Sequence, residues 1–91
     1  MDDYVMKVRA LRVGYMPWKR AVEQITEATG GRVKITQIKD GNKIVGLSFN
    51  PRTPGGIVHA GEWVVVDHAG FVTAWSDGDF RRRFTGTSEL V

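Results

Sequence analysis

The stretch WVVVDHAGFVTAW, residues 63–75, decides the fold of this chain of 91 residues. Its first four residues would be apolar on both faces of a strand, which is typical of a central strand covered on each side. Asp67 to Gly70 has the composition of a turn, and Phe71 to Trp75 returns as the partner strand. The stretch therefore predicts an antiparallel hairpin within a sheet. We expect Trp63 to fill the core between this sheet and a helix.

The residues before this hairpin predict one amphipathic helix and three further strands. Pro17 suits the first turn of a helix, and apolar residues then recur from Trp18 to Ala28 at the spacing of one helical face. Gly30-Gly31 ends this helix. The alternation of the first strand slips near Ala10, which predicts a β-bulge. The three strands are expected at Tyr4–Val13, Arg32–Ile38 and Lys43–Phe49.

A short second helix is predicted after the hairpin. Ser76 can cap this helix, and Asp79 lies three residues further on, as in a capping box. Phe80 and Phe84 are four residues apart and therefore share one face of a helix. We expect these two rings to hold the helix against the sheet.

The order of the elements is strand, helix, hairpin, hairpin and short helix, which predicts an α+β domain. We expect an antiparallel sheet of about five strands with the amphipathic helix packed on one face. Residues 1–91 are expected to form a single domain, and residues 85–91 a loose tail.

The composition is that of an ordinary folded globule with a small positive charge. Hydrophobic residues make up 42% and charged residues 25%, and the net charge is +3. There is no cysteine, which excludes a disulfide framework and a zinc site with cysteine ligands. No apolar run approaches about 18 residues, and the acidic start Met1-Asp2-Asp3 is unlike a signal peptide. We therefore expect a cytoplasmic protein that does not associate with membranes.

No group of residues matches a catalytic or metal-binding pattern. The spacing of His59 and His68 fits no zinc or iron site. Asp67 and His68 are adjacent, so in a strand they would point to opposite faces, and in a turn they are ordinary polar residues. We expect a protein that is not an enzyme and that uses no cofactor or metal.

Arginine and tryptophan residues form the strongest candidate for a binding surface. The run Arg81-Arg82-Arg83 and the nearby Trp75 would offer guanidinium groups and a stacking ring to a nucleic acid. The same arginines also complement the negative end of a short helix, so a purely structural role stays open. The candidate binding residues are Arg81, Arg82, Arg83, Trp75, Trp18 and Arg9.

Several features of the last third of the chain occur together. Residues 60–66 form a Gly-acidic-Trp turn into a hydrophobic strand, Gly70 lies in the next turn, and residues 76–80 with Phe84 form an acidic and aromatic closing segment. This combination resembles a family of small proteins of tailed bacteriophages, most of them of unassigned role. Ala60 and Glu62 stand where that family usually has proline and aspartate. The resemblance implies an accessory protein in the bacterial host cytoplasm and no known active site.

The combined observations predict a protein that acts by binding. The first hypothesis is a phage protein that binds a host or phage protein, and the resemblance would fit host takeover or counter-defence. An open sheet face or edge and the surplus of Trp and Arg favour a homo-oligomer, a dimer in particular. Two alternatives stay open: nucleic-acid binding through the basic and aromatic surface, and sequestration of a nucleotide signal in a pocket of an oligomer.

Overall fold

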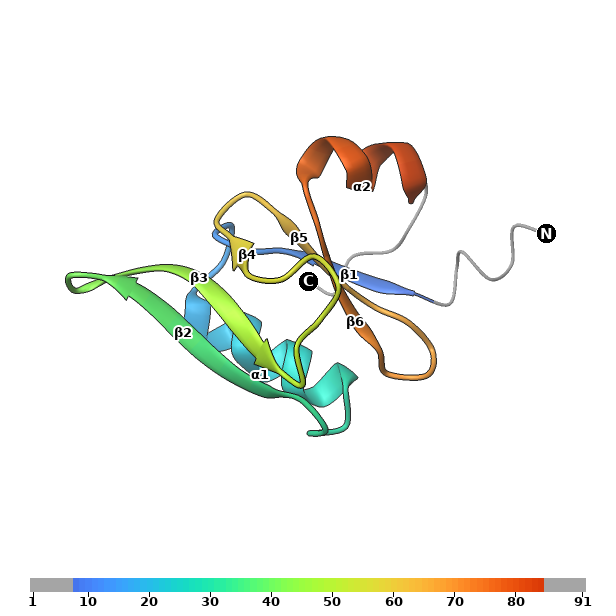
Figure 1. Cartoon of the computed structure of the whole chain (residues 1–91), viewed down its shortest axis with the longest axis horizontal. Coiled ribbons are helices and arrows are strands. Elements are labelled where there is room, and N and C mark those ends of the chain that lie inside the picture. The colour runs from blue at the N-terminus through green and yellow to red at the C-terminus, as the bar shows by residue number, and fades with distance from the viewer. Residues whose placement is uncertain (1–7, 85–91) are drawn as a thin grey trace.

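A computed structural model describes residues 8–84, and they have the predicted α+β architecture (Figure 1). The predicted tail at 85–91 and residues 4–7 of the first predicted strand lie outside this range. Within it, the elements in chain order are β1 (Arg9–Arg12), α1 (Trp18–Ala28), β2 (Lys34–Asp40), β3 (Lys43–Asn50), β4 (Val58–His59), β5 (Trp63–Val66), β6 (Val72–Trp75) and α2 (Asp77–Arg83).

The strands form two antiparallel sheets of three strands, in place of the one sheet of about five that the sequence predicted. One sheet has the order β1-β5-β6 and the other the order β2-β3-β4. After β4 the chain turns at Gly61, whose N–H donates to the Val13 carbonyl over 2.8 Å. The Val13 N–H in turn donates to the Glu62 carbonyl over 3.0 Å. These contacts direct β5 to β1, so the two predicted hairpins belong to different sheets.

Helix α1 covers a core that receives side chains from both sheets. The helix follows Pro17, as predicted, and its apolar face buries Ala21 and Ile25 completely. Buried residues of both sheets meet the helix there, because an amphipathic helix is stable only when its apolar stripe is packed. The main partners of α1 in this core are Leu11, Val13, Leu47, Phe49, Val58, Val64, Val66 and Val72.

A second core lies on the opposite face of the β1-β5-β6 sheet, beneath α2. Trp63 is buried, as predicted, but its ring stacks on Phe80 of α2 with centroids 3.9 Å apart and does not pack under α1. Side chains alternate along a strand, so Val64 and Val66 face the α1 core while Trp63 and Val65 face α2. The prediction that this strand is covered on each side is therefore confirmed.

Strand β1 is also covered on both faces, which explains its slipped alternation. Ala10 belongs to the α2 core and Leu11 to the α1 core, and both are fully buried. Their register with Val65 and Val64 of β5 is regular, so the predicted bulge near Ala10 was wrong. Two successive buried residues are simply what a strand between two cores requires.

Candidate nucleic-acid interface

The arginine run on α2 is largely engaged by aspartates of the same helix. Ser76 caps the helix, as predicted, by accepting a hydrogen bond from the Asp79 N–H over 3.2 Å. The Arg81 Nε donates to Asp77 Oδ1 over 3.0 Å, and Arg82 forms an ion pair with Asp79. The charges of Arg81 and Arg82 are therefore partly neutralised by neighbouring carboxylates.

Asp77 links α2 to both neighbouring strands of the sheet. The Trp63 indole N–H donates to Asp77 Oδ1 over 2.9 Å, and the Arg12 guanidinium lies 3.6 Å from Oδ2. The indole hydrogen bond is the main reason why the pKa of Asp77 lies below its ordinary value, and Arg81 and Arg12 lower it further against the effect of burial. These contacts attach α2 to the sheet. They also occupy the charged groups of Asp77 and Arg81, which are then less available to a ligand.

Replacing Asp77 with asparagine is expected to reduce the acid sensitivity of the fold. Because the pKa of Asp77 is lowered in the folded state, the ionised carboxylate stabilises the fold. This contribution is complete above the ordinary aspartate pKa of about 3.9 and is lost as the pH falls through the lower folded-state value. The urea midpoint of the wild type should therefore fall more between about pH 6 and about pH 3 than that of Asp77→Asn. Equal falls in the two proteins would contradict the assigned role.

The other predicted binding residues do not join the α2 arginines in one cluster. Trp75 packs its ring edge-to-face on Phe84 with centroids 5.0 Å apart, and its indole N–H donates to Thr73 Oγ1 over 2.6 Å. Arg9 is exposed and opposite Val66, at the far end of β5 from Trp75. Trp18 packs against the separate α1 core. The hollow beside Trp75 is also lined by Asp79, which is unfavourable for a phosphate.

A different set of cations lies on the β2–β3 hairpin, which the sequence analysis did not single out. Lys34, Lys39 and Lys43 are exposed, and none of them forms an ion pair within residues 8–84. Strand β4 pairs only with Gly46 and Leu47, so toward its tip the hairpin is a ribbon of two strands. Figure 1 shows this tip projecting away from the other elements. We call residues 34–50 the β2–β3 ribbon.

At its base, where β2 begins and β3 ends, the β2–β3 ribbon has one apolar and one polar face. Residues directly opposite each other on paired strands share a face. Ile35 and Phe49 form such a pair, and both pack in the α1 core. The adjacent pairs are therefore on the outer face, and they are Lys34 with Asn50 and Thr36 with Ser48. Lysine, amide and hydroxyl groups are the side chains that contact phosphates and base edges.

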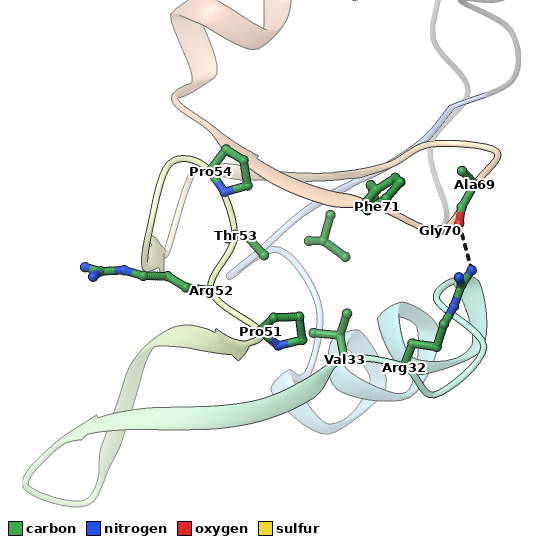
Figure 2. A pocket seen from close by; sticks show the side chains of 10 residues that line it. Arg32, Val33, Pro51, Arg52, Thr53, Pro54, Ala69, Gly70 and Phe71 are labelled. Atoms are coloured by element: carbon green, nitrogen blue, oxygen red, sulfur yellow. Dashed lines mark hydrogen bonds between the residues drawn. The ribbon is translucent and has the colours of Figure 1, made fainter.

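A cavity of about 680 Å³ opens at the base of the ribbon. Figure 2 shows three segments around it: Arg32–Val33 before β2, the loop Pro51–Pro54 after β3, and the turn Ala69–Phe71 between β5 and β6. Its walls are mainly apolar, and the charged residues that line it are Arg32 and Arg52. The sequence gives no signal for this site, because its aromatic and basic residues come from three segments that are distant in the chain.

The residues weighed as catalytic or metal-binding candidates have local roles. Asp67 Oδ1 accepts hydrogen bonds from the N–H groups of Ala69 and Phe71, both over 2.9 Å, and so shapes the β5–β6 turn. His59 lies 3.3 Å from the carboxylate of Glu62. Among the described residues, no three His, Cys, Asp or Glu side chains gather as a metal site. Neither helix in that part of the chain is long and apolar enough to cross a membrane.

Comparison with protein families gives a match over part of the chain. The model of the family described as Initiator Rep protein, WH2, matches residues 19–51. This segment contains α1 from its second residue, the whole β2–β3 ribbon and Pro51 of the cavity. No curated protein and no solved structure matches the chain. The motif residues of the resemblance to the tailed-phage family lie at 60–84, outside the matched segment, so that finer resemblance stays a prediction.

Proposed function

We propose that the chain is a non-enzymatic DNA-binding protein of a phage or plasmid replication system, and that the β2–β3 ribbon contacts the duplex. One observation carries the proposal. The segment that is similar to a replication initiator domain is also the segment that carries exposed lysines without ion pairs in residues 8–84.

The shape and charge of the ribbon support contact with a duplex. The major groove of B-DNA is about 12 Å wide and admits a two-stranded β-ribbon. Lys39 and Lys43 flank the tip, with Asp40 as the one acidic residue of β2 and β3, so the tip carries a net positive charge. Lysines bind phosphates and release counterions, which supplies most of the affinity for DNA.

The exposed face of α1 is less suited to the same contact. Lys19 and Arg20 on this helix are balanced by Glu23 and Glu27, and all four side chains are exposed. Carboxylates placed against phosphates are repelled. The proposal therefore assigns the duplex contact to the ribbon and not to the helix.

The other expectations from the sequence stay predictions. They are binding of a host or phage protein, self-association as a dimer, capture of a nucleotide signal in an oligomer, and the absence of enzymatic activity. Strand β2 lies at the edge of its sheet, where a second copy could pair. Size-exclusion chromatography with light scattering, with and without DNA, would separate a dimer from a monomer that binds DNA.

The double variant Lys39→Gln and Lys43→Gln is expected to weaken duplex binding through the loss of two phosphate contacts. Binding should be measured as the fluorescence anisotropy of a labelled duplex across about 50–200 mM salt. Each lost contact lowers the slope of log K against log salt by about 0.9, so the double variant should lower it by about 1.8.

The matched control removes two charges elsewhere. Arg9→Gln with Arg83→Gln takes away two exposed cations of the surface that the sequence predicted. The ribbon proposal expects this variant to keep the wild-type slope. If the control loses as much as the lysine variant, or if the wild type does not bind the duplex at low salt, the ribbon is not the DNA-binding element.

A further inference from the structure

The cavity at the base of the ribbon has an aromatic wall that the protein's own side chains leave uncovered. Phe71 is 71% exposed, which is unusual for a large apolar residue beside a cavity. Pro51, Pro54 and Val33 complete the apolar lining. An exposed phenyl ring offers a face on which a nucleobase can stack, whatever its sequence.

Arg32 is fixed across one side of the same cavity. Its Nη2 donates to the Ala69 carbonyl over 2.7 Å, the contact drawn in Figure 2, and its Nε donates to the Thr29 carbonyl over 3.3 Å. A guanidinium has five N–H donors, so three remain for a ligand. Gly70 has a φ of +87°, and a Cβ there would lie only 2.4 Å from Nη2. Because Gly70 has no side chain, the Arg32 guanidinium can occupy this space. The cation is therefore held in place before a ligand binds.

The charge around the cavity favours an anionic ligand. Arg32 and Arg52 are exposed. Among residues 8–84, no acidic residue lines the cavity, and neither arginine forms an ion pair. Guanidinium groups match the oxygens of a phosphate better than any other side chain does.

The three features together define the ligand chemistry. The apolar wall calls for a flat ring, the cations call for a phosphate, and the scarcity of polar lining means that the edges of the base stay in water. We propose that the cavity binds an unpaired nucleotide of single-stranded DNA, with the base against Phe71 and its phosphate at Arg32, while Arg52, on the opposite side of the cavity in Figure 2, meets another phosphate of the same strand. This inference deepens the proposed function, because it adds a single-strand site next to the ribbon assigned to the duplex.

Phe71→Ala is expected to weaken the binding of a single strand about tenfold and to leave duplex binding unchanged. The loss corresponds to the removal of one stacked base. The probe is a labelled oligothymidylate of about 12 nucleotides, measured by anisotropy beside the labelled duplex. Arg52→Gln should lower the single-strand salt slope by about 0.7.

Tyr15→Ala is the matched control. Tyr15 is a similarly exposed aromatic residue, at 68%, and lies outside the lining of the cavity. It should leave both affinities unchanged. If Phe71→Ala bound the single strand as tightly as the wild type, the inference would be overturned. It would also be overturned if thymidine monophosphate competed for the site as well as the oligonucleotide does, because the ligand would then be a free nucleotide. The variant Lys39→Gln with Lys43→Gln tests duplex binding by the ribbon, and Phe71→Ala tests single-strand binding by the cavity. Either proposal can therefore be refuted without the other.

Discussion

Trp63→Ala is expected to lower the free energy of unfolding by about 3–5 kcal/mol, the cost of removing a large buried aromatic side chain. Trp63 is 4% exposed and stacks on Phe80, and its indole N–H is bonded to Asp77. The variant loses the stack, leaves a cavity and frees the carboxylate that anchors α2. A chain of this size has a total stability of about 5–14 kcal/mol, so the substitution removes a large fraction of it.

Two variants separate the contributions of Trp63. Trp63→Phe keeps a ring over Phe80 but removes the indole donor, and it should cost clearly less than the alanine variant. Trp75→Ala is the matched control, because Trp75 is only half-buried and packs edge-to-face on Phe84. Urea unfolding followed by circular dichroism measures all three. If Trp63→Ala cost no more than Trp75→Ala, the second core would not hold α2 as described.

The elements of the fold were predictable because their signals are local. Pro17 and Gly30-Gly31 bound a single apolar stripe, and that stripe became α1. Residues 63–75 place two largely apolar segments on either side of a polar turn, and these segments became β5 and β6. Each of these signals depends only on residues within a few positions of one another, where steric and hydrogen-bonding preferences act directly.

The division into two sheets was not predictable in the same way. It depends on β4, which is two residues long and too short to show any periodicity. It depends also on the pairing of β5 with β1, which are about fifty positions apart in the chain. A strand with apolar residues on both faces shows that two layers cover it, but it does not show which elements supply them.

The same distinction between local and long-range signals applies to the candidate sites. The pairing of Asp77 with Arg81 and of Asp79 with Arg82 could be read from their spacing on a helix, and it weakens the case for the arginine run. The cavity could not be read, because Arg32, Arg52 and Phe71 belong to segments that only the folded chain brings together. A lone phenylalanine after a turn carries no signal of its exposure until its neighbours are known.

Gly55→Ala is expected to lower the free energy of unfolding by at least about 2 kcal/mol, from two causes that add. Gly55 has a φ of +92°, and a side chain in the left-handed region costs about 1–2 kcal/mol. A Cβ there would also lie 2.4 Å from the Ala74 carbonyl oxygen, a backbone atom that cannot rotate away. The loop would have to move from β6, which threatens the hydrogen bond from the Ala74 N–H to the Pro54 carbonyl, now 3.1 Å long.

The next residue provides a control that isolates the close approach. Gly56 has a φ of +70° and nothing within 4 Å of a Cβ, so Gly56→Ala has the backbone strain without the clash. Urea unfolding should show a clearly larger loss for Gly55→Ala, and equal losses would mean that the loop does not lie against β6 as described. Because the loop Pro51–Pro54 forms a wall of the cavity, Gly55→Ala should weaken single-strand binding as well, whereas Gly56→Ala should not. The contact of this loop with β6 would then support both the fold and the proposed nucleotide site.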